Sequence, residues 1–141
     1  MRSWLARKLV ERQMAALRAG DCGPTLKMDA DDVCLHFPGE SSWAGDIRGK
    51  EAHGAWLARF IKVGLKIYAD EVMVMGPLWH MRIGVRGRTY LHAPDGTQIY
   101  ENRYVLWGHL RWGRLADYEV YEDTVKSLAL DDYLAIHEPA T

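Results

Sequence analysis

The segment from Thr97 to Thr124 reads TQIYENRYVLWGHLRW, then GR, then LADYEVYEDT, which is two strand-like runs joined by a tight connection. In both runs mainly apolar and mainly charged positions alternate with a period of two, so each set lies on one face of a sheet. The mainly apolar set is Tyr100, Asn102, Tyr104, Leu106, Gly108 and Leu110, followed by Ala116, Tyr118, Val120 and Glu122. We expect this set to face the interior and the other set to face water or a partner.

Asn102 and Glu122 are the strongly polar members of this inner set. A buried polar group costs free energy unless it is hydrogen-bonded or used in function. The hairpin is therefore where we expect a functional site.

The bulk composition describes an ordinary globular protein. The chain has 141 residues, enough for one domain with a real core, and we expect a single domain over 1–141. It is 48% hydrophobic and 26% charged, and its 18 Lys and Arg stand against 19 Asp and Glu. This balance gives no basic excess that would attract nucleic acid and no polybasic membrane anchor.

Two cysteines, Cys22 and Cys34, are spaced like neither a metal knuckle nor a redox pair. Two thiols in a chain of this length do not make a disulfide scaffold, which favours a reducing compartment. The N-terminal stretch MRSWLARKLVERQM is charged and amphipathic, without the continuous apolar core of a signal peptide. No apolar run is long enough to span a bilayer. The expected location is the cytoplasm.

The rest of the chain places helices first and strands afterwards. Helices are predicted over 3–20, with Ser3 as cap and Gly20 as stop, over 24–28, and over 50–63. Strands are predicted over 33–37, 65–75 and 78–88, with a polar loop over 40–49. After the hairpin, Asp123 is expected to cap a last helix. This order predicts an α+β fold.

Several short motifs carry a resemblance to a known family. They are LRAGD at 17–21, DV at 32–33, HFPG at 36–39, IRGKEA at 47–52, YEN at 100–102, GRL at 113–115 and the run 118–123. In this order and spacing they resemble the SnoaL-like branch of the nuclear-transport-factor-two-like superfamily, over roughly residues 8–130. That branch includes polyketide cyclases, ketosteroid isomerase, scytalone dehydratase and limonene epoxide hydrolase.

The resemblance implies a curved sheet wrapped around a conical pocket that the N-terminal helices close. It also implies a homodimer built on the outer face of the sheet. Val105 and Trp107 belong to the outer set of their strand, and exposed apolar surface of this kind typically marks an interface. The superfamily shares a pocket but no common chemistry, so the fold does not decide the function.

Two of the family's chemistries are not expected here. Limonene epoxide hydrolase needs an Arg-x-Asp on a middle strand and an Asp on the last strand, and the nearest matches are Arg82 with Gly84, and Val120. Its first-strand Tyr and Asn correspond to Cys34 and His36. Ketosteroid isomerase uses an Asp just before the Pro that follows the first strand and a Tyr on the first helix. Here His36 and Phe37 precede that Pro, and the first helix has no Tyr.

Two titratable residues are the candidate acid/base groups, and we expect them to border one cavity. His36 titrates near neutrality and would sit in the pocket mouth, although it can equally hydrogen-bond to a neighbouring strand or to the loop at Glu40. Glu122 faces the apolar side of the last strand, where desolvation raises a carboxyl pKa. Its position at the end of the strand alternatively lets it reach solvent.

Other side chains are candidates for holding a substrate. Asn102 and Tyr104 have donors that can orient a carbonyl, although an inner-face Asn also suits a bulge or a helix end. Tyr118, Trp43 and Trp56 are expected to line or cover the cavity, with core packing as the alternative for Trp56. Arg82 is turned outward by the periodicity of its strand and inward by the resemblance, and a bulge could reconcile the two.

Two functional hypotheses follow. The first is a cofactor-independent acid/base enzyme, of isomerase, cyclase or dehydratase type, acting on a moderately apolar ligand with His36, Glu122 and Arg82 as catalytic groups. The second is a non-catalytic protein that binds a small molecule in the same cone. Catalysis requires titratable groups that converge on one ligand. The remaining histidines lack metal-ligand spacing, so we expect neither a metal nor a cofactor.

Overall fold

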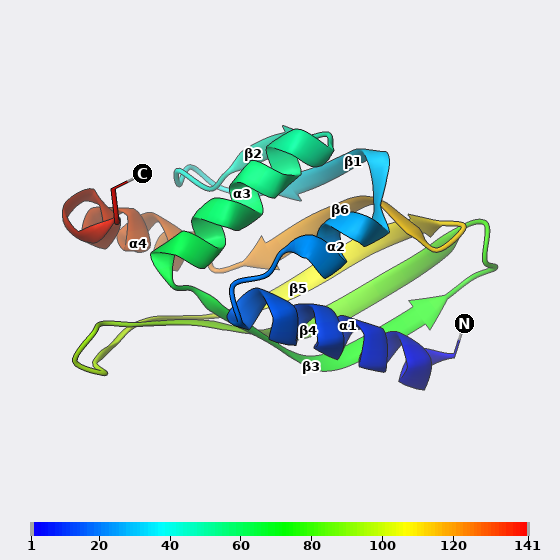
Figure 1. The fold of residues 1–141 in the computed structure, drawn as a ribbon, viewed down its shortest axis with the longest axis horizontal. Helices are drawn as coiled ribbons and strands as arrows, with labels where there is room; N and C mark the ends of the chain where they lie inside the picture. Colours follow the sequence, from blue (N-terminus) through cyan, green and yellow to red (C-terminus); the bar gives the residue numbers. More distant parts are fainter. Residues whose placement is uncertain (1, 141) are drawn as a thin grey trace.

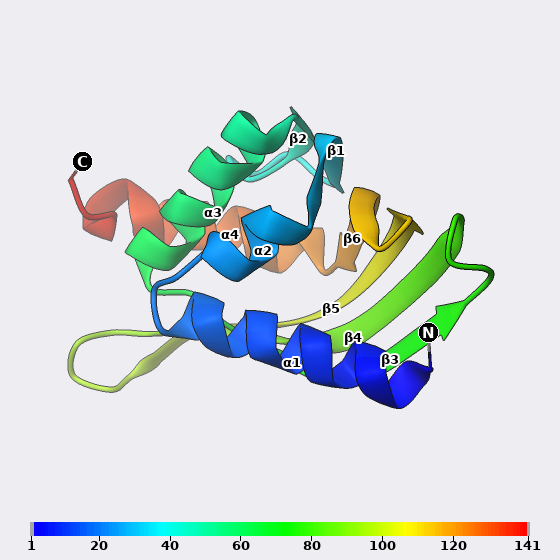
Figure 2. The ribbon, with the colours of Figure 1, turned by 45° about the vertical axis from the view of Figure 1, so that its right-hand side comes forward.

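A strongly bent six-stranded sheet forms the body of the protein in the computed structural model, which describes residues 2–140. Three helices, α1, α2 and α3, lie on its concave side, and α4 lies at one end (Figure 1 and Figure 2). The helices are α1 (Ser3–Arg18), α2 (Gly23–Met28), α3 (Lys50–Val63) and α4 (Thr124–His137). The strands are β1 (Asp29–Phe37), β2 (Gly45–Arg48), β3 (Lys66–Met75), β4 (Met81–His92), β5 (Gln98–Arg111) and β6 (Arg114–Glu122). The predicted α+β class is confirmed.

The strand order is β2-β1-β6-β5-β4-β3. Neighbouring strands are antiparallel except β1 and β6, which run parallel, so the first strand of the chain lies beside the last. This pairing brings the start of the chain to the hairpin. It allows residues of β1 and β6 to contribute to one site.

The helices begin and end close to the predicted residues. α3 ends at Gly64, which adopts the left-handed conformation that glycine favours at this position. Asp123 caps α4 as predicted, because its side chain accepts hydrogen bonds from the backbone N–H groups of Val125 and Lys126. Ser3 is not a cap: it is the first residue of α1, and Arg2 precedes it without a side-chain hydrogen bond to the helix.

The strands differ more from the prediction. β1 begins at Asp29 instead of residue 33, because the backbone at Asp29 pairs with Leu115 before a register shift leads to Cys34. The predicted polar loop contains the short strand β2. β4 begins three residues late, because residues 77–80 form a turn in which the His80 N–H donates to the Pro77 carbonyl.

The β5–β6 hairpin has the predicted alternation. Asn102, Tyr104, Gly108 and Leu110 are buried, while the intervening charged residues face outward. Arg111 pairs with Arg114, so the turn consists of Trp112 and Gly113, with φ values of 51° and 77°. Positive φ at both central residues is the geometry that suits the twist of a two-residue hairpin.

Gly87 on β4 allows the sheet to close around the core. A Cβ atom at this position would overlap the Tyr68 carbonyl and the Tyr104 hydroxyl. The absence of a side chain lets Tyr104 cross β4 and donate a hydrogen bond to the Tyr68 carbonyl at 2.9 Å. Two groups of buried apolar side chains result, one between α1 and the sheet and a second around Trp43, Phe60 and Leu134 near α4.

Candidate active site

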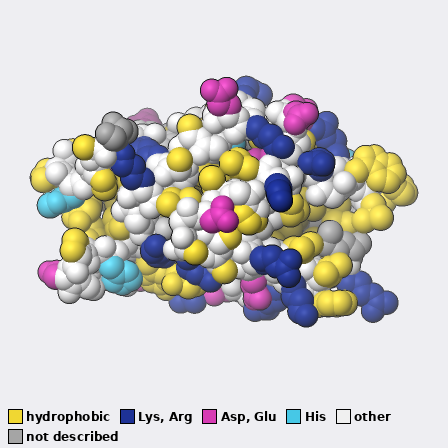
Figure 3. Space-filling view, in the orientation of Figure 1, with side chains coloured by type: hydrophobic (Ala, Val, Ile, Leu, Met, Phe, Trp, Pro, Cys, Tyr) yellow, Lys and Arg dark blue, Asp and Glu magenta, His cyan; other side chains and the backbone are white. Residues whose placement is uncertain are grey.

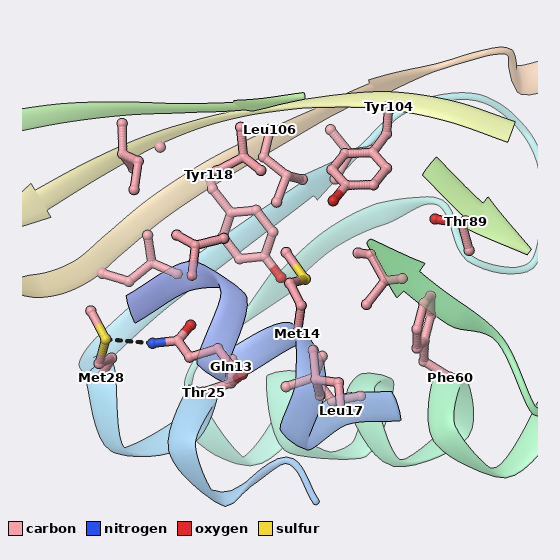
Figure 4. Close-up of a pocket in the computed structure, with 18 of the residues that line it drawn as sticks. Gln13, Met14, Leu17, Thr25, Met28, Phe60, Thr89, Tyr104, Leu106 and Tyr118 are labelled. Carbon is pink, nitrogen blue, oxygen red and sulfur yellow. Dashed lines mark hydrogen bonds between the residues drawn. The ribbon is translucent and has the colours of Figure 1, made fainter. Parts of the chain in front are cut away.

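A cavity of about 160 Å³ lies between the helices and the concave face of the sheet. Side chains from β5 and β6 point toward α1 across it (Figure 4). Its lining is mainly apolar: Ala6, Leu9, Val10, Met14, Leu17, Phe37, Trp56, Leu57, Phe60, Ile67, Ile83, Val85, Leu106, Leu110, Leu115 and Val120 contribute. An apolar cavity of about 150 Å³ is large enough to hold benzene. The space therefore suits a ligand with a single ring.

Six polar side chains border this cavity: Gln13, Thr25, Thr89, Tyr104, Tyr118 and Glu122. Two of them are occupied by contacts within the protein, since Tyr104 donates to Tyr68 and the Gln13 amide contacts Met28 (Figure 4). Tyr118 and Glu122 differ from the other four because each is connected to further titratable or polar groups.

Tyr118 is the cavity end of a buried hydrogen-bond chain. Its hydroxyl oxygen lies 2.6 Å from Nε2 of His53, and Nδ1 of His53 lies 2.6 Å from Oδ2 of Asp29. Asp29 and His53 have no exposed surface, while Tyr118 is half-buried and borders the cavity. An ionised Asp29 makes Nδ1 the protonated nitrogen of the neutral imidazole, and Tyr118 then donates to Nε2.

The three residues come from three elements that the topology brings together. Asp29 is the first residue of β1, His53 lies in the first turn of α3, and Tyr118 is on the inner face of β6. The parallel pairing of β1 with β6 places Asp29 beside the strand that carries Tyr118. Burial, and secondarily the charge of Asp29, raises the pKa of Tyr118. The phenol therefore stays protonated at neutral pH.

Within the hydrogen-bonded trio of Asp29, His53 and Tyr118, one carboxylate oxygen has no partner among the described residues. Oδ1 of Asp29 is buried and accepts no hydrogen bond from residues 2–140. An unpaired buried carboxylate oxygen is costly, and such groups concentrate where a function uses them. The Asp–His arrangement is one that orients an imidazole and stabilises its protonated form.

Glu122 is the second connected group. Its Oε2 accepts hydrogen bonds from Tyr100 at 3.0 Å and Asn102 at 2.7 Å, and from the buried Ser127 of α4. Burial raises the pKa of Glu122, and the three donors partly oppose this effect. Burial also raises the pKa of Tyr100 to about 12. The donors fix the carboxyl group against the sheet.

The other oxygen of Glu122 is not held by the part of the protein that the structure describes. Oε1 accepts no hydrogen bond within the described residues, yet it is not among their buried unpaired atoms, so it keeps accessible surface. Glu122 and Tyr118 are four residues apart on the same face of β6, which places their Cα atoms about 13 Å apart. The two groups therefore lie at different positions along the strand.

The structure brings together part of the predicted site. Glu122, Tyr104, Tyr118 and Trp56 border the cavity. Asn102 is buried behind Glu122, which it holds, and does not itself border the cavity. Trp43 is also set back: its backbone carbonyl accepts a hydrogen bond from Nε1 of Trp56, and the two rings pack edge to face.

His36 does not border the cavity, and the expectation that it shares one with Glu122 is wrong. Leu35 and Phe37 face the core, so His36 points to the outer face, where Nδ1 lies 2.8 Å from Oδ1 of Asp46 on β2. His36 is therefore hydrogen-bonded to a neighbouring strand, which was the alternative prediction for this residue.

Arg82 also lies outside the cavity, and its inward placement is wrong. It pairs with the outer-face residue His109, while its neighbour Met81 is buried opposite Leu110. No bulge interrupts the β4–β5 register at this point. The periodicity of the strand predicted its direction correctly, and the resemblance did not.

Asp29 and His53 are the site residues that the sequence analysis missed. Asp29 stands in an acidic stretch that reads as a loop, and His53 was one of several histidines without ligand spacing. The available signal was the helical position of His53, four residues before Leu57 and seven before Phe60, which places it on the buried face of α3.

Comparisons with known proteins identify the fold. No family model and no curated protein sequence matches the chain. Among solved structures, an NTF2-like protein of unknown function from Burkholderia pseudomallei is 21% identical, covering 88% of this chain and 95% of its own, with a TM-score of 0.72. TerC, co-crystallised with polyporic acid, is 22% identical, covering 91% and 96%, with a TM-score of 0.70. A proposed SnoaL-like polyketide cyclase from Jannaschia sp. CCS1 is 16% identical, covering 98% and 95%, with a TM-score of 0.65.

These likenesses confirm that the chain has the fold of NTF2-like and SnoaL-like proteins. They do not carry an activity, because identities of this size show the fold alone. Within residues 2–140, no helix is both long and apolar enough to cross a membrane.

Proposed function

We propose that this protein is a cofactor-independent acid/base enzyme that moves protons on a small, mainly apolar ligand with one oxygen function. The reaction is of isomerase, cyclase or dehydratase type. The observation that carries the proposal is the buried chain from Asp29 through His53 to Tyr118, which ends at an apolar cavity. A buried chain of this kind has a high desolvation cost, and a proton-transfer role accounts for it.

The series of hydrogen bonds from Asp29 through His53 to Tyr118 can pass a proton in both directions. A ligand hydroxyl or enol that gives its proton to the Tyr118 oxygen lets the phenol pass its own proton to Nε2 of His53. The imidazolium that forms is stabilised by Asp29 through the bond at Nδ1. The reverse transfer protonates a ligand oxygen and restores neutral His53.

Glu122 supplies the second proton-transfer position. Its raised pKa brings it closer to neutrality, where a general acid or base is most effective. When His53 carries the extra proton and Glu122 is ionised, Oε1 can take a proton from a carbon of the ligand while Tyr118 protonates the ligand oxygen and receives a proton from Nε2 of His53. The product is an enol. Return of the Glu122 proton to another carbon, with the enol proton passing through Tyr118 back to Nε2 of His53, completes an isomerisation in which no atom is gained or lost.

A non-catalytic binding protein is the second candidate. The mainly apolar lining and the relative co-crystallised with polyporic acid favour simple ligand binding. For either function, a homodimer through the outer sheet face is part of the proposal, because Val105 and Trp107 are 38% and 41% exposed there.

Isomerisation of cyclohex-3-en-1-one, a one-ring ketone, tests the proposal directly, and deuterium uptake from D₂O next to its carbonyl gives a second readout. We expect the parent protein to accelerate both, and Tyr118→Phe and Glu122→Gln each to lower the rate by roughly 10²–10⁴-fold. Thr89→Val, another change at the cavity surface, should keep the rate within a few-fold. Saturable binding of the ketone without acceleration by the parent would favour the binding protein.

A further inference from the structure

Three tryptophans project from one end of the protein. Trp4 near the start of α1, Trp79 in the β3–β4 turn and Trp112 in the β5–β6 turn are 60%, 59% and 72% exposed. In both views of the ribbon, the start of α1 and these two turns lie at the same end of the molecule (Figure 1 and Figure 2). We call this end, with Trp4, Leu78, Trp79 and Trp112, the tryptophan end.

The two turns form one continuous apolar surface. The backbone N–H of Trp112 donates to the carbonyl of Leu78 at 3.0 Å, and the Trp79 and Trp112 rings lie 6.1 Å apart. Trp112 holds a positive φ of 51°, a conformation that an ordinary side chain adopts at a cost and that Asn or Gly prefers. The turn therefore presents a large aromatic side chain where folding alone favours a small one.

Cationic side chains surround this apolar surface. Arg114 flanks the Trp112 turn together with Arg111, whose guanidinium is paired with Asp32 at 2.5 Å. Arg2 and Lys8 flank Trp4, with the Lys8 ammonium 5.7 Å from the Trp4 ring. Lys8 and Arg114 form no ion pair within residues 2–140. Hydrophobic side chains with Lys and Arg beside them gather at the right-hand end of the surface (Figure 3).

We propose that the tryptophan end docks on an anionic phospholipid surface. Indole rings settle at the boundary between headgroups and acyl chains because they are apolar with one polar N–H. Lys and Arg are attracted to anionic headgroups, and the tryptophan end supplies both features in one place. The net charge of the whole chain is -1, so the attraction comes from the cationic side chains at the tryptophan end and not from the overall charge.

The apolar cavity suggests a function for the docking. α1 presents Trp4 and Lys8 to the outside, while Ala6, Leu9 and Val10 of the same helix line the cavity. A mainly apolar ligand partitions into bilayers, so an enzyme or carrier held at the bilayer surface meets it at a higher local concentration. The docking itself does not depend on which of the two functions is correct.

Co-sedimentation with vesicles tests the proposal. Vesicles of phosphatidylcholine with 30% phosphatidylglycerol should bind the full chain at least tenfold more tightly than vesicles of phosphatidylcholine alone. The double variant Trp79→Gln, Trp112→Asn should weaken this binding at least tenfold. Asn suits the positive φ at position 112, so the variant keeps its turn. Ile136→Gln, which removes an 80% exposed apolar residue from α4, is the matched control and should bind like the parent.

Three results would overturn the proposal. The first is equal sedimentation of the parent with both vesicle types, or none with either. The second is an equal loss of binding in the double variant and in Ile136→Gln. The third is a vesicle-free dimer that the double variant abolishes, which would assign the tryptophan end to a second copy of the chain.

Discussion

Nε2 of His53 and the hydroxyl oxygen of Tyr118 lie 2.6 Å apart, and only Tyr118 of the two borders the cavity. In the proposed function His53 therefore acts on a ligand through Tyr118, and its own environment is set by Asp29 on its other side. The pair separates two roles. In the proposed reaction, Tyr118 meets the ligand and His53 stores or supplies the proton.

This arrangement predicts a large stability loss for His53→Leu. The substitution leaves the buried Asp29 carboxylate without the hydrogen bond to its Oδ2, and leaving a buried charged acceptor unpaired costs about 3 kcal/mol or more. Urea unfolding followed by circular dichroism measures the change. His92→Leu, at an exposed position on β4, should shift the free energy of unfolding by less than about 0.5 kcal/mol. A loss below about 1 kcal/mol for His53→Leu would show that Asp29 is satisfied without the imidazole.

Glu122 predicts a pH dependence with a definite sign. Its pKa in the folded protein is raised above the ordinary value of 4.5, so the folded state holds a proton more tightly than the unfolded state. Stability from this group therefore falls as pH rises from about 4.5 through the folded pKa, and is constant above it. Glu122→Gln removes this dependence.

Unfolding in urea at several pH values between 4 and 8 measures the effect as a difference between parent and variant. Carboxyl groups with lowered pKa, such as Asp46 and Asp70, act in the opposite direction but equally in both proteins. Their contribution cancels in the difference. Parallel stability curves for parent and Glu122→Gln would contradict the raised pKa.

At position 87 we expect that even a methyl group is not tolerated in place of the glycine hydrogen. Gly87→Ala forces a Cβ atom against the Tyr68 carbonyl and the Tyr104 hydroxyl, and backbone cannot move aside cheaply. We expect a loss of about 3 kcal/mol or more, at the upper end of overpacking costs. Gly84→Ala is the control on the same strand, since its Cβ would meet only the Trp107 ring at 3.6 Å. Equal thermal stabilities of the two variants would show that β4 moves to accommodate the methyl group.

The inner face of the hairpin could be predicted from sequence because β5 and β6 alternate clearly. The same rule placed Arg82 on the outer face. It failed for His36 because the run Val33–Phe37 is apolar at nearly every position, so no alternation distinguishes its faces. Asp29 and His53 could not be predicted as site residues from the sequence, for another reason. Their contact joins residues 24 apart, and the irregular β1–β6 register that brings Asp29 to the site leaves no periodic pattern.

The outer face of the sheet predicts self-association. Val105 and Trp107 are exposed there beside Tyr121, which pairs with Val105 and is 54% exposed. Burying such a surface in a symmetric dimer removes apolar area from water, the main driving force for association. We expect sedimentation velocity at about 10 µM to show a dimer for the parent and a monomer for Trp107→Glu. Ile136→Glu places the same charge on α4 and should leave the dimer intact, as should the Trp79→Gln, Trp112→Asn variant. A parent that sediments as a monomer at tens of micromolar, or a dimer that survives Trp107→Glu, would exclude this face as the interface.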